Sequence, residues 1–195
     1  MPTLEYLRIS KDQKLLLLGI SEEGERSRYT VSESFYRSLG SPARGTVLTE
    51  EEISLIKGED ERIRATRKAL SLLSYSDNNE KGLVTKLLRV GFSRDVAMGV
   101  SEEMVRLGYI DESRQLERLI LREANVSLSG FGKILPKLMS KGYSAENIKK
   151  ITHRLVESGE IDFKENAKRL IEKKLPDDAS REEKKKLLYK NGYKV

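Results

Sequence analysis

The sequence predicts a mainly α-helical protein made of tandem three-helix repeats in an elongated curved array, with a small N-terminal β-meander as a cap. Three observations support this fold class. A pattern of apolar residues and glycines recurs 51 positions further along the chain, which is typical of repeat proteins. Charged residues make up 35% of the 195 residues and aromatic residues only 6%, a balance typical of helices with large exposed surfaces. Strand-like patterns are confined to roughly the first 35 residues.

The internal repeat defines the predicted domain organisation. Residues 86–93 (KLLRVGFS) return as residues 137–144 (KLMSKGYS), and a broken copy lies at residues 186–193. In the same register, residues 108–111 (GYID) match residues 159–162 (GEID). The predicted parts are a strand-rich cap with a connecting helix at 1–62, repeat one at 63–111, repeat two at 114–162, and an incomplete third repeat at 165–195.

Glycines and capping residues mark where the helices of each repeat begin and end. Gly91 is expected to end the second helix of repeat one, because glycine readily adopts the left-handed conformation found at helix C-termini. Ser93 is placed to cap the third helix, which Gly108 ends. Asp111 and Asp162 stand where the N-cap of the next repeat's first helix is expected. We therefore interpret these two carboxylates as helix caps rather than as metal ligands or acid/base groups.

Three further positions bear on individual helices. Residues 77–80 (DNNE) have the pattern of a capping box before the second helix of repeat one, and Glu165 completes a second box with Asp162. Pro136 falls inside the second helix of repeat two. Because proline lacks the N–H that an interior helix position needs, this helix is expected to start late or to kink.

The first 62 residues follow a different pattern. Apolar runs separated by polar segments at 11–13 and 21–24 indicate a three-stranded meander. A short helix is expected over residues 35–39, ending at Gly40, and residues 49–52 (TEEE) form a capping box for the helix that leads into repeat one. Three strands barely form a stable unit alone, so the sheet is expected to pack on helices.

Composition limits the class of protein. The chain has no cysteine, which excludes disulfides, thiolate catalysis and cysteine-ligated zinc and fits a reducing cytoplasm. The longest apolar run, residues 15–18, is far shorter than the roughly 20 residues of a membrane span, and the N-terminus has no signal-peptide pattern. We therefore expect a soluble, cytoplasmic protein that does not contact the membrane.

No set of residues with a catalytic pattern stands out in the sequence. His153 is the only histidine, and it is expected on the surface or in packing next to an apolar stripe. Residues 130–134 (GFGKI) resemble part of a phosphate-binding loop, but Ser127 occupies the position of its first glycine, and no strand precedes the segment. We predict that the chain is not an enzyme, and we assign no catalytic, cofactor-binding or metal-binding residues and no cofactor.

Basic charge accumulates toward the C-terminus. The net charge is +6 overall, with 9 basic and 12 acidic residues in 1–62 but 10 basic and 6 acidic residues in 165–195. Such a bias favours polyanionic partners.

In repeat two, basic residues recur every four positions along two predicted helices, so each set lies on one helix face. These candidate residues for contact with nucleic acid or with an acidic partner are Arg114, Arg118, Arg122, Lys133, Lys137 and Lys141. The alternative is an ordinary solvated face.

Four segments together resemble the RecX family of regulatory proteins. They are residues 69–75 (ALSLLSY), 86–93, 107–112 (LGYIDE) and 137–143 (KLMSKGY), and the resemblance spans most of residues 4–195. The combination of the four segments is fairly specific. The start of the second helix at residues 130–132 and Pro136 depart from the family pattern.

The resemblance implies a cytoplasmic modulator of the RecA recombinase that takes part in DNA repair, DNA recombination and the SOS response. It implies binding in the groove of a RecA filament on single-stranded DNA, with inhibition of ATPase and strand-exchange activity. It also implies direct DNA binding, with duplex DNA as an additional ligand. We expect a monomer.

Two alternative functions remain open. One is a sequence-specific DNA-binding transcription regulator, and the other is an accessory scaffold subunit that does not contact nucleic acid.

Overall fold

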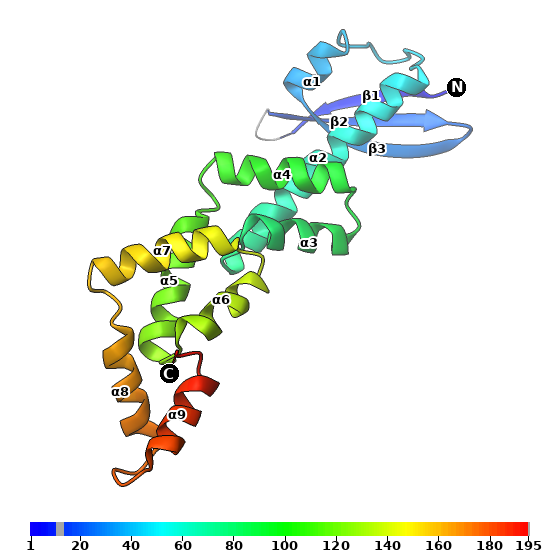
Figure 1. Cartoon of the computed structure of the whole chain (residues 1–195). Helices are drawn as coiled ribbons and strands as arrows, with labels where there is room; N and C mark the ends of the chain where they lie inside the picture. The colour runs from blue at the N-terminus through cyan, green and yellow to red at the C-terminus, as the bar shows by residue number, and fades with distance from the viewer. Residues whose placement is uncertain (11–13, 195) are drawn as a thin grey trace. The chain divides into compact units, whose positions relative to one another are not determined.

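The structure, a computed structural model, describes residues 1–10 and 14–194 and is mainly helical with one small sheet (Figure 1). The antiparallel sheet has the order β1 (Thr3–Ile9), β2 (Leu15–Glu22) and β3 (Glu25–Ser32). The helices of the described residues are α1 (Glu33–Ser38), α2 (Glu50–Tyr75), α3 (Glu80–Val90), α4 (Arg94–Arg106), α5 (Glu112–Leu121), the π-helical turn η1 (Arg122–Val126), α6 (Phe131–Met139), α7 (Ala145–Glu157), α8 (Phe163–Lys174) and α9 (Arg181–Lys190). The predicted fold class, mainly helical with an N-terminal meander, is confirmed.

The chain divides into two compact units. Unit 1 consists of residues 1–76 and 83–104, and unit 2 consists of residues 77–82 and 105–195, apart from the positions that the structure does not describe. The predicted turn at residues 11–13 is among those positions. No helix in the described part of the chain is long and apolar enough to cross a membrane.

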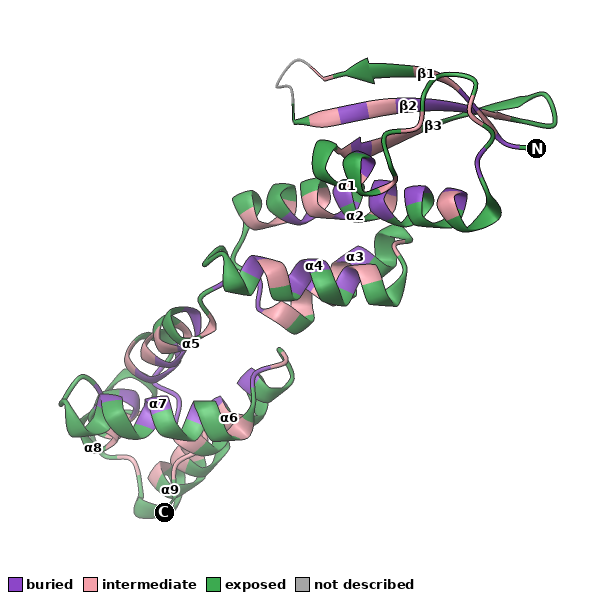
Figure 2. Cartoon of the chain, turned by 90° about the horizontal axis from the view of Figure 1, so that it is seen from above, coloured by how far each residue is buried: buried purple, intermediate pink, exposed green. Residues whose placement is uncertain are grey.

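The core of unit 1 lies between the sheet and its helices. Alternation along β2 turns Leu16, Leu18 and Ile20 to one face, where all three are buried. Figure 2 shows α1 and α2 on one side of the sheet, and Ile53 and Ile56 of α2 belong to the same apolar cluster. The sheet therefore packs on helices, as expected for a meander too small to be stable alone.

Two acidic residues of α2 bind the edge strand β3. Asp60 accepts a 2.8 Å hydrogen bond from the Thr30 N–H, and Glu59 accepts a 2.8 Å bond from the Ser32 hydroxyl. Burial raises the pKa of Glu59, but hydrogen bonds from Arg62 and Ser32 outweigh it, so the pKa is lowered and the carboxylate stays ionised. These contacts anchor β3 to α2, which runs without a break from residue 50 to 75. The connecting helix before residue 62 and the first helix predicted after it are thus one helix.

The 51-residue period also appears in the helix boundaries. Three pairs of helices start 51 positions apart: α3 and α6 at Glu80 and Phe131, α4 and α7 at Arg94 and Ala145, and α5 and α8 at Glu112 and Phe163. Gly91 and Gly142 have φ values of 101° and 99°, as expected for glycines that end a helix in the left-handed conformation. The repeat boundaries themselves stay a prediction.

Most of the predicted caps are present. Asp111 accepts from the Arg114 N–H, and Asp162 accepts from the N–H groups of Lys164 and Glu165. These backbone hydrogen bonds lower the pKa of Asp162. Thr49 begins α2 with a complete capping box. The roles of these aspartates as helix caps are therefore confirmed.

Four details differ from the prediction. Glu165 does not complete a capping box with Asp162; its carboxylate pairs instead with the Lys168 ammonium at 3.3 Å. Asn79, not Asp77, caps α3, because its side-chain oxygen accepts from the Gly82 N–H at 2.9 Å. Pro136 does not delay α6, which starts in register with α3. The helix that begins as α5 continues into the π-helical turn η1, which nothing in the sequence indicated.

The C-terminal turn docks on the start of α6 through backbone contacts. The N–H groups of Gly130 and Gly132 donate to the carbonyls of Asn191 and Gly192 at 2.8 and 2.9 Å. A Cβ atom at Gly130 would lie 2.4 Å from the Gly192 carbonyl group. The glycines at 130 and 132 thus permit a close backbone approach, and the chain's red end lies beside α6 in Figure 1.

Candidate functional site

The six basic residues predicted for partner contact are all exposed and lie in unit 2. Arg114 and Arg118 are on α5, and Arg122 is the first residue of η1. Lys133 and Lys137 are on α6, whereas Lys141 lies in the turn after α6 ends at Met139. The predicted second row of lysines therefore leaves the helix before its last member.

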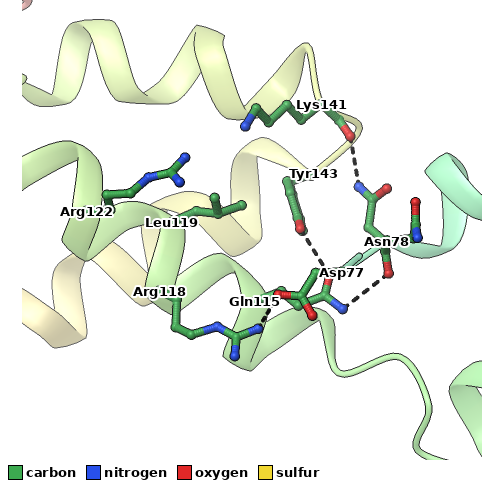
Figure 3. Close-up of a pocket in the computed structure, with 9 residues that line it drawn as sticks. Asp77, Asn78, Gln115, Arg118, Leu119, Arg122, Lys141 and Tyr143 are labelled. Atoms are coloured by element: carbon green, nitrogen blue, oxygen red, sulfur yellow. Dashed lines mark hydrogen bonds and ion pairs between the residues drawn. The ribbon is translucent and has the colours of Figure 1, made fainter. Parts of the chain in front are cut away.

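A pocket in unit 2 brings together members of both rows. It has a volume of about 420 Å³ and lies between residues 77–79, α5 and the turn after α6. Arg118, Arg122 and Lys141 line it (Figure 3). The Arg118 guanidinium forms a 2.5 Å ion pair with Asp77 at one edge. Because three cations surround the opening and only one carboxylate lines it, the pocket favours an anionic group.

A hydrogen-bonded polar wall forms the inner side of the pocket. The Tyr143 hydroxyl donates to the Gln115 side-chain oxygen at 3.2 Å, and Gln115 donates to the Asn78 carbonyl at 3.2 Å (Figure 3). Asn79 donates to the Lys141 carbonyl at 2.9 Å. All four wall residues are less than 10% exposed. Such a satisfied network fixes the segment before α3 against α5 and holds the turn that carries Lys141.

Tyr143 remains a hydrogen-bond donor over a wide pH range. Burial raises the pKa of its hydroxyl, and the nearby carboxylates of Glu112 and Asp77 raise it further, while Arg118 lowers it. The phenol therefore stays protonated at neutral pH and keeps its bond to Gln115. The wall is neutral, and the positive charge of the pocket comes from its rim.

Glu123 connects the two basic rows beneath the surface. Its side chain is only 4% exposed and pairs with the Lys137 ammonium at 2.7 Å and, more loosely, with Arg122 at 3.8 Å. A buried carboxylate is costly unless it is paired. Lys137 therefore has a structural role in addition to any contact with a partner, which its exposure alone would not reveal.

Replacing Lys137 is expected to destabilise unit 2. The Lys137→Met variant keeps the aliphatic stem but leaves Glu123 with only the distant Arg122, so the free energy of unfolding is expected to fall by about 1–2 kcal/mol. Chemical denaturation measures this change. Lys149→Met, an exposed position on α7, is the control and should change stability by less than about 0.5 kcal/mol. Equal effects of the two variants would contradict the role of Lys137.

Two of the six predicted residues lie apart from the pocket. Arg114 is in the first turn of α5, before Arg118, and does not line the pocket. The Lys133 ammonium lies 3.1 Å from the side-chain oxygen of Asn191, in the docked C-terminal turn. The structure thus brings together Arg118, Arg122 and Lys141.

Sequence reasoning missed the polar wall. Residues 77–80 were interpreted only as a helix cap, and Gln115 was not considered. One signal was present: Gln115 falls among apolar positions of α5, and 51 residues later Asn166 occupies the equivalent place and is also buried. A polar residue in an apolar register in two repeats indicates a buried hydrogen bond between segments.

The described residues contain no group of three or more histidine, cysteine, aspartate or glutamate side chains that could hold a metal ion. His153 is on the surface, with its side chain 75% exposed and its Nδ1 atom 3.1 Å from Glu157. What the pocket offers is charge, hydrogen-bond donors and a fixed shape, which are the features of a binding site.

Curated relatives share one name. The chain is 27% identical to the regulatory protein RecX of Clostridioides difficile (strain 630) over 147 residues, which are 75% of this chain and 67% of the relative. It is 29% identical to the regulatory protein RecX of Lactobacillus johnsonii over 105 residues, which are 54% of this chain and 39% of the relative. The chain thus matches less than half of the second relative's length. No family model matches the chain.

Solved structures share the fold. A crystal structure of a regulatory protein RecX has a TM-score of 0.75 at 20% identity, and the match covers 100% of this chain and 95% of that one. RecX from Lactobacillus salivarius has a TM-score of 0.58 at 19% identity over 70% of this chain and 90% of that one. The names of the sequence relatives, together with a fold that agrees with them, support the assignment of this chain to the RecX family of regulatory proteins.

Proposed function

We propose that this chain binds the RecA filament on single-stranded DNA and inhibits its ATPase, recombinase and strand-exchange activity. The observation that carries the proposal is the likeness to regulatory proteins named RecX, which extends along three quarters of the chain in sequence. The contact is proposed to involve the rim of the unit 2 pocket, where Arg118, Arg122 and Lys141 meet. Lys133, Lys137 and Arg114, which do not line the pocket, are proposed as secondary contacts.

The electrostatics of unit 2 support a polyanionic partner. Residues 114–164 carry 10 basic and 6 acidic residues, and the six proposed contact residues are exposed. Phosphates of a single strand and acidic side chains of a protein filament both interact with guanidinium groups through charge-assisted hydrogen bonds. The polar wall holds the backbone of the turn that carries Lys141 through the hydrogen bond from Asn79 to the Lys141 carbonyl, so less backbone has to become ordered on binding.

Adding the protein to RecA on single-stranded DNA is expected to lower the DNA-dependent ATPase rate and strand exchange. The expected cause is occupation of the filament by a bound regulator. The measurement is the rate of ATP hydrolysis at a fixed filament concentration with increasing protein. An unchanged rate at a several-fold excess would overturn the proposed function, and heat-unfolded protein at the same concentration is the control.

Two other functions make different predictions. A transcription regulator would prefer one duplex sequence, and that preference would persist at high salt. An accessory scaffold subunit would bind its partner with little salt dependence and would not bind DNA. Binding of single-stranded and duplex oligonucleotides across a salt series therefore separates the three.

A further inference from the structure

The face of the N-terminal sheet that points away from α1 and α2 carries one aromatic residue and several arginines, together with Leu15 and Leu17 of β2. Because the apolar residues of β2 face the helices, the other face holds the cross-strand row Tyr6, Gly19 and Arg28. Arg8 and Arg26 follow on the same face, two residues away from Tyr6 and Arg28 along β1 and β3. We call this surface, formed by Tyr6, Arg8, Arg26 and Arg28, the outer face. It belongs wholly to unit 1.

Gly19 holds the Tyr6 ring flat against the sheet. A Cβ atom at Gly19 would lie 2.1 Å from the Tyr6 ring, so the ring occupies the space that a side chain would fill. The Arg8 guanidinium lies over the ring, with its Cζ atom 5.3 Å from the ring centroid. This distance is typical of a cation–π contact. The Tyr6 ring therefore lies between Gly19 and the Arg8 guanidinium, which leaves the guanidinium on the solvent side.

The charge around this stack is positive. Arg26 is exposed, and Glu5 is its partner at 3.0 Å. Arg28 and Arg44 are also exposed, and Arg44 lines a hollow of about 560 Å³ together with Tyr6, Arg8 and Arg26. Three arginines, Arg8, Arg26 and Arg44, thus line the hollow with Tyr6 against the single acidic side chain of Glu5, and Arg28 is the cross-strand neighbour of Gly19. The other acidic residues of the sheet, Glu22, Glu23 and Glu25, gather at the β2–β3 turn.

We propose that the outer face is a binding site for single-stranded nucleic acid, in which a base stacks on the Tyr6–Arg8 pair and neighbouring phosphates contact Arg26, Arg28 and Arg44. Bases stack on aromatic rings and on guanidinium planes, and a basic groove beside them follows the backbone. A duplex does not expose its base faces, so it cannot use the stack. The acidic residues at the β2–β3 turn disfavour phosphates there, so we expect the nucleic acid to cross the face beside the Tyr6–Arg8 pair and Arg44. This site does not depend on the function proposed for unit 2.

The Arg8→Lys variant tests the stack without changing charge. Lysine keeps the positive charge but has no planar group on which a base can stack. The probe is a labelled thymidine oligonucleotide of about 15 nucleotides, within the range bound by small single-strand sites, with an abasic oligonucleotide of equal length as its counterpart. The full chain is expected to bind the thymidine strand at least about five-fold more tightly than the abasic strand. Arg8→Lys is expected to lose most of this ratio while its affinity for the abasic strand stays the same.

A matched control and a second variant complete the experiment. Arg67→Lys makes the same change at an exposed position on α2 and is expected to leave the ratio unchanged. Tyr6→Leu keeps an apolar cover on Gly19 and is expected to lower the ratio as Arg8→Lys does. Binding to a duplex of the same length should be equal for the original chain and Arg8→Lys. The proposal is overturned if the original chain does not distinguish the two strands, or if neither variant changes the ratio. It is also overturned if Arg8→Lys weakens duplex binding equally, since the effect of the residue would then not depend on exposed base faces.

Discussion

Replacing Gly130 by alanine is expected to release the C-terminal turn from α6. The backbone at Gly130, with φ of −73° and ψ of 162°, suits alanine, so the effect is steric and not conformational. The added Cβ would lie 2.4 Å from the carbonyl carbon and oxygen of Gly192, which belong to backbone and cannot move aside as a side chain can. Overpacking of this kind costs roughly 1–3 kcal/mol, and weakening the two backbone hydrogen bonds adds to it.

Hydrogen exchange measures this release directly. The Gly132 N–H donates to the Gly192 carbonyl, so its exchange rate reports the opening of the turn. A loss of about 2–3 kcal/mol in opening free energy corresponds to exchange that is about 30- to 150-fold faster. The hydrogen bond from the Tyr193 hydroxyl to the Leu128 carbonyl, 3.1 Å long, should be lost at the same time.

Gly99→Ala is the matched control for this variant. Gly99 is in α4, where a Cβ atom would have nothing within 4 Å, so alanine should stabilise the helix by about 0.5–1 kcal/mol. Unchanged exchange at Gly132 in Gly130→Ala would contradict the docking of the turn.

Much of the fold follows from local patterns in the sequence. The repeat of 51 residues can be read from the sequence directly. Gly91 and Gly142 favour the backbone conformation found where helices end, and the side chains of Asp111 and Asp162 favour the N-cap position. The structure places each of these four residues at a helix end. Strand alternation and turn residues likewise identify the meander. These features depend on residues close together in the chain, which is why they can be recognised without coordinates.

Contacts between distant segments were not predictable in the same way. The N-cap of α3 is Asn79 and not Asp77, and Asp77 pairs instead with Arg118, 41 residues away. The π-helical turn η1 places Glu123 inward beside Lys137, and no residue preference signals such a turn. The spacing of the basic residues predicted two rows on helices, but only the folded chain shows that Arg118, Arg122 and Lys141 share one pocket.

The same docking pattern occurs twice in unit 2. The Lys141 carbonyl accepts from Asn79 before α3, and the Asn191 carbonyl accepts from Gly130 before α6. In the first case a side-chain amide spans the gap, and space for a pocket remains beside it. In the second case two backbones meet directly through Gly130 and Gly132, and the C-terminal turn fills the space. The basic pocket thus lies beside Asn79, at the position where Gly130 stands 51 residues later.

Neutralising the pocket rim is expected to weaken binding to single-stranded DNA with little loss of stability. In the double variant Arg122→Gln and Lys141→Gln, Lys137 still pairs with Glu123 at 2.7 Å, so the buried carboxylate keeps its closer partner. If both side chains contact phosphates, the slope of log affinity against log salt should fall by about 1.4, since each single-strand contact contributes about 0.7. At about 0.1 M salt this corresponds to roughly 25-fold weaker binding. The same salt series with the RecA filament as the ligand tests whether the rim residues also contribute to filament binding.

The control for the rim changes the same number of charges on another face of unit 2. Lys149 and Lys150 are exposed on α7, and neither lines the pocket. Lys149→Gln with Lys150→Gln lowers the net charge equally and should reduce the affinity only through the general field of the protein, by less than about three-fold. If Arg122 and Lys141 contact phosphates, replacing them lowers both the affinity and the salt slope, and replacing Lys149 and Lys150 does not. If only the general field of the protein matters, the two double variants lose the same affinity. Equal losses in the two would therefore show that Arg122 and Lys141 belong to an ordinary solvated face, and the proposed contact surface would have to be sought elsewhere on the chain.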